Sequence, residues 1–361
     1  MRVAIFGAGV AGLTAAAALH RRVNHCRVYE RRHRGAAGGL GFIMSAQALA
    51  DLQALGLPDT AARAGVPLRE FCRYRPDGTL AHTRPMPTGW RGMRRADLVA
   101  ALRHALPAET MVAGTALTGL TRARDGGVGA ALLTNDLDDA WQLRADLYLA
   151  ADGARSVARQ TLYPAWPHRP ARVWEVVAYA HDPAISAWAG SDFHKFAIPG
   201  LAAGILPVGD DTVVWFIQFD RFRFTPPATP DPTRALAHQL IGDWGHPLPS
   251  LLRATDFSQA HLWQPVDTDL LPRLHSGNLA LVGDAAHPLL PFTSQGVAAA
   301  IAGVRDLASA LEQHCSLPAA LETYSASCRA RCAPYIGQGR ELTRRFLQPD
   351  GRADDLLPVS T

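Results

Sequence analysis

The first thirty residues, 1-MRVAIFGAGVAGLTAAAALHRRVNHCRVYE-30, decide the fold. Residues 3–6 have the apolar character of a short buried strand, and residues 10–20 predict an alanine-rich helix directly after a glycine turn. Residues 26–29 predict a second strand, which ends at Glu30. The pattern Gly7-x-Gly9-x-x-Gly12, with an acid 18 residues later, is therefore typical of a βαβ dinucleotide-binding unit.

Each glycine of this pattern has its own physical role. Gly7 permits the tight turn, Gly9 lets the backbone approach a pyrophosphate, and Gly12 lets the helix pack on the strand. The N-terminus of the helix would then face the dianion. The alternative is a chance glycine turn, but strand, helix and acid all stand where the motif requires them. The residues expected to contact the cofactor in this unit are Gly7, Gly9, Ala11, Gly12, Glu30 and Arg31.

The composition is that of a folded, multidomain chain. At 361 residues it exceeds the usual length of one domain, and 48% apolar with 19% charged residues excludes wholesale disorder. The net charge is +4, but the basic residues, all arginine except Lys195, are scattered and form no basic block. We therefore expect no nucleic-acid partner.

Compartment and metal content are read from the apolar runs and the cysteines. The N-terminal apolar run is interrupted by the three motif glycines, unlike an export signal, and no other run reaches the about 20 apolar residues that a membrane span needs. The five cysteines form no CxxC pair, so we predict a cytoplasmic protein. Cys328 and Cys332 would share a helix face, but without a nearby second ligand pair we assign no metal.

The rest of the chain predicts an α/β protein in four segments. A first part of the nucleotide-binding domain, residues 1–163, includes a helix at 95–106 and a strand at 147–151. Residues 164–265, rich in proline and tryptophan, predict an inserted and mainly antiparallel substrate-binding sheet, with strands at 172–180, 193–198 and 212–219 and a helix at 234–244. Residues 266–347 return to the nucleotide-binding domain, with a strand at 279–282 and helices at 297–313 and 318–346, and residues 348–361 predict a flexible tail.

Three separated segments together resemble the class A FAD-dependent monooxygenases, also called flavoprotein aromatic hydroxylases. The first is residues 7–30, the second is 145-ADLYLAADGARS-156, similar to the DG motif of the family, and the third is 283-GDAAHP-288, similar to its GD motif. The segment 93-MRRADL-98 adds a fourth match. The resemblance implies a Rossmann-like FAD-binding domain with an inserted substrate domain and C-terminal helices.

The resemblance also implies roles for single residues. Asp284, an acceptor-only carboxylate, would bind ribityl hydroxyls, and Glu30 would bind the adenosine ribose. Arg95 is similar to the family arginine that contacts FAD. Further contacts implied by the resemblance are a backbone contact of Leu117 to adenine, cofactor binding by Asp152, and a nicotinamide or interdomain contact of Arg155, for which an ordinary surface arginine is the alternative.

The segment 291-PFTSQG-296, which precedes an alanine-rich helix, corresponds to the loop that crosses the flavin ring in the family. Pro291, Gly296 and Val297 are therefore expected at the flavin, where the positive end of the helix favours the negative charge of the reduced ring. The family usually has glycine where this chain has Ser294 and asparagine where it has Ala298. Flavin binding is expected in spite of these differences.

The implied activity is oxygen insertion: NADH or NADPH reduces FAD, dioxygen forms a flavin hydroperoxide, and a small aromatic or polycyclic substrate is hydroxylated or epoxidised. No catalytic base is assigned, because His287 and His194 are expected to be structural and the cofactor carries the hard chemistry. Two alternatives stay open, namely an FAD-dependent oxidoreductase of the same fold that inserts no oxygen and a non-catalytic flavin-binding protein. A flavin halogenase is disfavoured, since that class needs an active-site lysine and a Trp-x-Trp motif, whereas this chain has no Trp-x-Trp and its sole lysine, Lys195, lies in the inserted domain.

Overall fold

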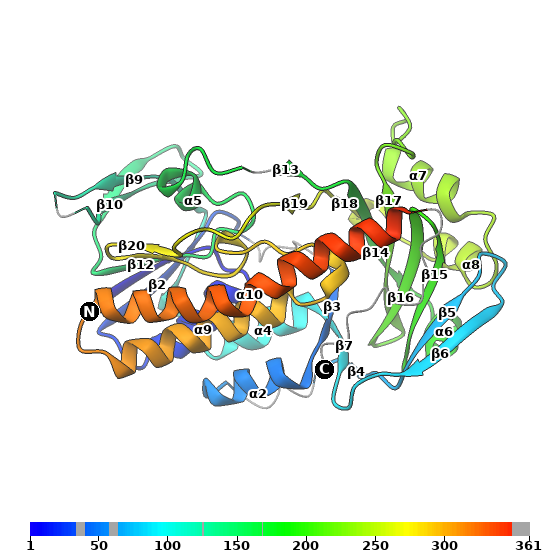
Figure 1. Ribbon diagram of the computed structural model, residues 1–361, viewed down its shortest axis with the longest axis horizontal. Helices are drawn as coiled ribbons and strands as arrows, with labels where there is room; N and C mark the ends of the chain where they lie inside the picture. The colour runs from blue at the N-terminus through cyan, green and yellow to red at the C-terminus, as the bar shows by residue number, and fades with distance from the viewer. Residues whose placement is uncertain (34–39, 58–63, 125, 168, 349–361) are drawn as a thin grey trace.

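The computed structural model describes residues 1–33, 40–57, 64–124, 126–167 and 169–348. Of the predicted tail, residues 348–361, only Gln348 lies within these ranges. The described residues form an α/β protein with two main sheets, one on each side of Figure 1, and two long C-terminal helices, of which the last reaches from the first sheet to the second.

A six-stranded sheet forms the core of the nucleotide-binding half. Its strand order is β20-β21-β12-β1-β2-β8, and every pair is parallel except β20 with β21. Parallel pairing buries both faces, which explains the uninterrupted apolar runs of β1, β12 and β21. The strands are β1 Arg2–Phe6, β2 His25–Glu30, β8 Met111–Ala113, β12 Leu147–Ala150, β20 His275–Ser276 and β21 Leu279–Leu281.

Helices pack against this sheet and form one continuous apolar core with it. All ten residues of α1 are buried, because its alanines and Gly12 allow close approach on every side. The helix α9 lies against α1, and α10 lies along α9 (Figure 1). The helices of this half are α1 Val10–Leu19, α2 Ala46–Ala54, α4 Arg95–His104, α5 Val157–Leu162, α9 Gly296–Gln313 and α10 Leu317–Leu347, with short 3-10 turns η1 Ala108–Thr110, η3 Gly283–Ala285 and η4 Pro291–Thr293.

Two smaller sheets complete this half. The first has the strand order β11-β10-β9 with antiparallel strands, and β9 lies beside β2 of the main sheet. The order β3-β7-β4 leads toward the second half, where β7 contacts β16. The strands are β9 Thr115–Arg122, β10 Val128–Asn135, β11 Ala140–Leu143, β3 Gly41–Met44, β4 Val66–Pro67 and β7 Arg91–Arg94.

A seven-stranded sheet forms the second half, with the order β18-β14-β17-β16-β15-β5-β6. Five of the six strand pairs are antiparallel, among them all the pairs between strands of residues 164–265 as predicted, and only β15 with β5 is parallel. The sheet also takes two strands from residues 70–85, which the predicted insert did not include. The strands are β5 Glu70–Tyr74, β6 Leu80–Pro85, β14 Val173–His181, β15 Asp192–Ile198, β16 Leu201–Gly209, β17 Thr212–Asp220 and β18 His261–Trp263.

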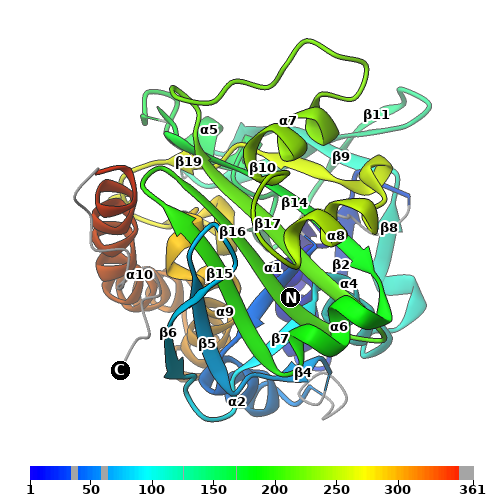
Figure 2. The same cartoon turned by 90° about the vertical axis from the view of Figure 1, so that its right-hand side faces the viewer.

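The outer face of this sheet is covered by helices, as Figure 2 shows face-on. Trp215, Ile217 and Phe219, which alternate along β17, share one buried apolar cluster with the helices. The elements are α6 Pro183–Ala189, α7 Pro232–Ile241, α8 Leu248–Arg253 and η2 Phe257–Gln259, and the short pair β13 Arg169–Pro170 with β19 Val266–Asp267 joins the halves.

The inner face of the seven-stranded sheet meets the nucleotide-binding half through a small apolar cluster. Phe292 of η4 packs with Leu342 and Phe346 at the end of α10 and with Ala197 and Ala202 of the sheet. The rings of Phe292 and Phe346 are 5.1 Å apart. In Figure 1 the last turns of α10, in red, reach the β14–β17 end of the sheet. None of the helices among the described residues is long and apolar enough to cross a membrane.

Candidate active site

The turn after β1 has the geometry that its glycines predict. Gly7 has φ +103°, and a Cβ there would lie 2.3 Å from the main-chain oxygen of Ala151. A Cβ on Gly12 would lie 1.9 Å from the main-chain oxygen of Gly7. Any side chain at either position would therefore push α1 away from β1 and β12.

The N-terminus of α1 is left without a side-chain cap. Gly9 stands at the N-cap position in extended backbone, and no side chain of the described residues caps the first turn, which includes Ala11. Helix N-termini carry unpaired amides and a partial positive charge, so this end suits a pyrophosphate.

Glu30 ends β2 at the same edge of the sheet. Its Oε2 accepts a hydrogen bond of 2.8 Å from the amide of Ala8, and its Oε1 accepts one of 3.1 Å from Arg32. The carboxylate is therefore held beside the glycine turn, where the motif expects a ribose contact. Arg31 is exposed directly after it.

The GD motif is packed onto the first turn of α1. Gly283 has φ +59°, and a Cβ there would stand 2.6 Å from the Cβ of Ala11. Asp284 follows with an exposed side chain, and its carboxylate has no hydrogen-bond partner among the described residues. Gly7, Glu30, Ala151 and Asp284 all stand at the carboxyl ends of parallel strands, where α/β sheets bind their ligands.

Arg159 joins the DG motif to the GD motif, and sequence reasoning missed it. From α5 its Nη1 donates hydrogen bonds of 3.0 Å to the main-chain oxygens of both Asp284 and Ala285, and its Nη2 donates to that of Ala154. The side chain is 4% exposed, so these carbonyls compensate a buried charge. The basic residue quoted within the DG motif, Arg155, is exposed instead.

Arg95 begins α4, and its side chain reaches the glycine turn. Its Nη2 lies 3.5 Å from where a Cβ would stand on Gly9, and its buried Nε has no hydrogen-bond partner among the residues that the structure describes. Burial lowers the pKa of Arg95, while the charge of Asp284 acts in the opposite direction. An unpaired guanidinium nitrogen beside a phosphate-binding turn fits an anionic group there.

Asp152 and Leu117, which were also expected to contact the cofactor, interact with other parts of the protein. Oδ2 of Asp152 accepts hydrogen bonds from the amides of Val157 and Ala158 at the start of α5, while its buried Oδ1 has no partner within the described ranges. Leu117 lies on β9, half-buried against the main core. The cofactor contacts of Asp152 and Leu117, and the nicotinamide or interdomain contact of Arg155, stay predictions.

The loop that was expected to cross the flavin forms η4 and leads into α9. Pro291 begins η4 and Ser294 ends it with φ +51° and ψ +19°, the left-handed region that favours glycine. Ser294 thus adopts a backbone conformation that glycine tolerates better than serine. Gly296 begins α9 without a side-chain cap, Val297 follows it, and no described atom lies within 4 Å of a Cβ on Gly296.

Taken together, the residues present fit FAD. The uncapped end of α1 and Arg95 can hold the pyrophosphate, Glu30 the adenosine ribose, and Asp284 the ribityl chain. The uncapped end of α9 lies next to the same edge, since α9 contacts both α1 and η3. These contacts are our assignment of the site, which the geometry supports.

The two histidines that were expected to be structural are both buried. His194 points to the outer face of its sheet, where its ring nitrogens bond to Ala189 and Tyr74. His287 lies in the core with Cys328 and Cys332, and the potential ligand atoms of these three residues are within 4.8 Å of one another. Sequence reasoning did not place His287 near these two thiols. That they hold no metal stays a prediction.

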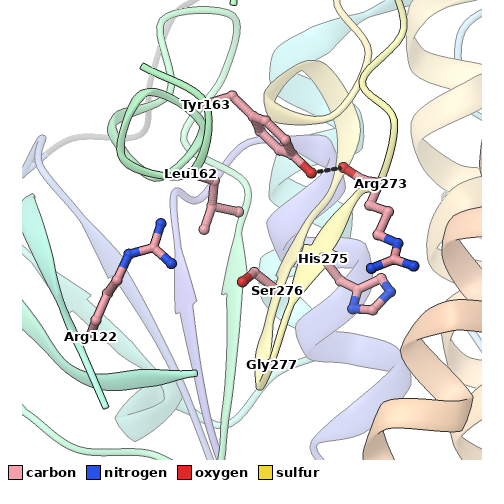
Figure 3. A pocket seen from close by; sticks show the side chains of 7 residues that line it. All are labelled: Arg122, Leu162, Tyr163, Arg273, His275, Ser276 and Gly277. Carbon is pink, nitrogen blue, oxygen red and sulfur yellow. Dashed lines mark hydrogen bonds between the residues drawn. The ribbon is translucent and has the colours of Figure 1, made fainter. Parts of the chain in front are cut away.

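A cavity of about 290 Å³ lies elsewhere, beside the turn between β20 and β21 (Figure 3). This turn is at the opposite end of β21 from Asp284, so the cavity is not part of the cofactor site. The hydroxyl of Tyr163 donates a hydrogen bond of 2.9 Å to the main-chain oxygen of Arg273 at its rim. The residues that line it are Arg122, Leu162, Tyr163, Arg273, His275, Ser276 and Gly277.

Comparison with known proteins agrees with this geometry. Residues 1–336 match the family described as FAD binding domain. The 3-amino-4-hydroxybenzoate 2-monooxygenase of Streptomyces cremeus is 31% identical, with 97% of this chain and 89% of that protein covered. The FAD-dependent urate hydroxylase of Klebsiella pneumoniae is 25% identical over 96% of this chain and 94% of that protein.

Solved structures share the fold. Klebsiella pneumoniae HpxO, crystallised with FAD and uric acid, has a TM-score of 0.83 at 22% identity, covering 97% of this chain and 90% of that one. A salicylate hydroxylase in complex with its substrate has a TM-score of 0.75 at 22% identity, covering 98% and 91%. The family match extends over nearly the whole chain, and its motifs meet at one edge of the sheet. The chain therefore belongs to the class A FAD-dependent monooxygenases, the flavoprotein aromatic hydroxylases.

Proposed function

We propose that this protein uses NADH or NADPH and dioxygen to insert one oxygen atom into a small aromatic substrate, most simply by hydroxylation. The observation that carries the proposal is that the glycine turn after β1, the DG motif and the GD motif meet at one edge of the six-stranded sheet. The uncapped N-terminus of α9 lies beside this edge, and the seven-stranded sheet lies beyond it. Curated relatives are named as monooxygenases of 3-amino-4-hydroxybenzoate, urate and kynurenine, all ring compounds.

The chain itself would contribute binding, orientation and charge stabilisation. FAD, when bound, supplies electron transfer and the reaction with oxygen. The turn after β1 and Arg95 hold its phosphates, while Arg159 fixes the backbone of Asp284 for the ribityl chain. The positive end of α9 favours negative charge on the reduced ring, and the cluster around Phe292 excludes water from the junction of the two halves.

The reduction step is proposed to use a transiently bound nicotinamide, because the described residues contain one glycine-rich nucleotide turn and its partners fit FAD. Slow nicotinamide oxidation without substrate, and faster oxidation with it, would limit wasted peroxide. A cytoplasmic location remains our expectation from the cysteines.

The test follows oxygen uptake by the FAD-loaded protein with each nicotinamide and a panel of aromatic acids, phenols and quinolones under ¹⁸O₂. A product that is heavier by one labelled oxygen supports the proposal. Substrate turnover with no labelled product would identify an oxidoreductase that inserts no oxygen, and flavin that is never reduced would identify a flavin-binding protein without this activity.

A further inference from the structure

Three polar side chains form a row across the inner face of the seven-stranded sheet. Glu175 of β14 stands directly opposite Gln218 of β17, and Nε2 of Gln218 donates a hydrogen bond of 2.5 Å to Oε1 of Glu175. The Nζ of Lys195, from β15, donates one of 3.0 Å to Oε1 of Gln218. Each side chain is 5% exposed or less, so the row is a buried charge network and not a surface ion pair.

The row crosses β16 because this strand carries small residues at that point. Lys195 is paired with Gly204, and Gln218 is paired with Ala202, in the strand between them. A Cβ on Gly204 would lie 2.2 Å from Cζ of Phe216, so the ring of Phe216 occupies the space above this glycine. Lys195 therefore extends over β16 to β17 beside an aromatic ring.

The ammonium group of Lys195 also faces the cofactor half. It lies 5.8 Å from the ring centre of Phe216 and 5.7 Å from that of Phe292. Phe292 belongs to η4, directly before the helix whose N-terminus was assigned to the flavin. Within the described ranges, Lys195 donates a hydrogen bond only to Gln218, which leaves two of its three N–H donors without an acceptor.

An anionic partner would stabilise a buried ammonium with unused donors, and the described residues show no direct ion pair between Lys195 and Glu175. Gln218 separates the two charges, and burial lowers the pKa of Lys195 to about 8 and raises that of Glu175 to about 7. The aromatic faces of Phe216 and Phe292 offer a flat apolar surface next to the charge. A flat ring with a negatively charged oxygen satisfies both features.

We infer that Lys195 is a specificity-determining residue that receives an anionic oxygen of the aromatic substrate, a carboxylate or a phenolate, while Gln218 and Glu175 orient its ammonium. The inference rests on the proposed function only because it takes the junction between the seven-stranded sheet and η4 as the substrate site. It predicts a preference for ionised aromatic compounds over neutral compounds of the same shape.

The test is a binding titration of the FAD-loaded full chain, followed through the flavin absorbance difference spectrum. It needs neither nicotinamide nor turnover, so its outcome is separate from that of the oxygen-insertion experiment. One arm compares 4-hydroxybenzoate with 4-hydroxybenzamide, and the other compares pentafluorophenol, ionised at neutral pH, with phenol. The variants are Lys195→Met, Lys195→Arg and the control Arg253→Met, which removes an exposed charge on α8 behind the sheet.

The parent and Arg253→Met should bind the anion of at least one pair more tightly than its neutral partner, by about 10- to 100-fold, the usual strength of a hydrogen bond to a charged group. Lys195→Met should lose this preference and Lys195→Arg should keep most of it. Equal binding of both members of both pairs by the parent, no binding of either anion, or an undiminished preference in Lys195→Met would overturn the inference. Should Lys195→Met fail to fold, Lys195→Gln takes its place, since it keeps a polar group without the charge and should lose the preference as well.

Discussion

The guanidinium of Arg159 donates a hydrogen bond of 3.0 Å to the main-chain oxygen of Asp284, a residue 125 positions further along the chain. A second bond of 3.0 Å goes to the next carbonyl, that of Ala285. The two motifs that flank the cofactor edge are thus joined by one buried side chain.

Replacing Arg159 with Met should therefore disturb both motifs. The variant leaves buried carbonyls without donors, and we expect a loss of about 2 to 4 kcal/mol in the free energy of unfolding, together with weaker FAD retention. Urea unfolding and the FAD content of the purified protein measure the two effects. Arg144→Met, at an exposed position just before the DG motif, is the matched control and should change neither. A stable Arg159→Met with full flavin content would contradict this role.

Asp284→Ala should weaken FAD binding without unfolding the protein. Its carboxylate is exposed and has no partner among the described residues, so the fold loses little, whereas the ribityl hydroxyls would lose an acceptor worth about 1 to 3 kcal/mol. Equilibrium titration of the apoprotein with FAD measures the change. Asp243→Ala removes an exposed acid elsewhere and should bind FAD normally. Unchanged affinity in Asp284→Ala would remove this residue from the site.

Gly296→Val should fold normally and yet bind flavin poorly. No described atom lies within 4 Å of a Cβ at this position, so the substitution obstructs only what approaches the start of α9. Gly337→Val is a matched control, since a Cβ there also meets no described atom and the residue is exposed on α10. Melting temperature and FAD occupancy separate folding from binding. If Gly296→Val retains flavin and forms product as the parent does, our placement of the flavin is wrong.

Ser294→Gly should be at least as stable as the parent. A non-glycine residue in the left-handed region costs about 1 to 2 kcal/mol, of which the greater freedom of glycine in the unfolded chain cancels about 0.4 to 1. Ser294→Val should be destabilised, because a β-branched side chain tolerates this backbone poorly. Thermal unfolding of both variants tests the expectation. A clear fall in the melting temperature of Ser294→Gly would show that the serine side chain makes a contribution of its own.

The buried Glu175 predicts a pH dependence of stability. Burial raises its pKa from 4.5 in the unfolded chain to about 7, so the folded protein holds this proton more tightly. The resulting stabilisation is complete below pH 4.5 and is lost as the pH rises through 7, by at most about 3 kcal/mol. Lys195 stays charged over this window, since its pKa is about 8. Urea unfolding at pH 5, 6 and 7 should show the parent losing stability relative to Glu175→Gln, and parallel curves would refute the assignment.

Local sequence determined the nucleotide-binding unit, because its requirements are local. The turn at Gly7, the packing at Gly12 and the acid at Glu30 are backbone and spacing constraints within thirty residues, and the structure has them as predicted. Three strands of the inserted sheet, β14, β15 and β17, were also predicted, since alternation and length are visible along the chain. The central strand β16 and the helices α6 and α8 were not predicted.

Contacts between residues that are far apart in the sequence could not be predicted from local patterns. The participation of β5 and β6 in the second sheet depends on pairing across more than a hundred residues, and nothing local distinguishes that pairing from a separate hairpin. Arg159 stands four residues after the arginine that the motif suggested, and only the path of α5 turns one inward and leaves the other exposed. The row of Lys195, Gln218 and Glu175 likewise exists because the strand order places three distant residues on one face, across a strand with Ala202 and Gly204. The sequence by itself determined the cofactor unit, whose physics is short-range, whereas only the tertiary structure decided which buried charges meet, because that depends on strand order and register.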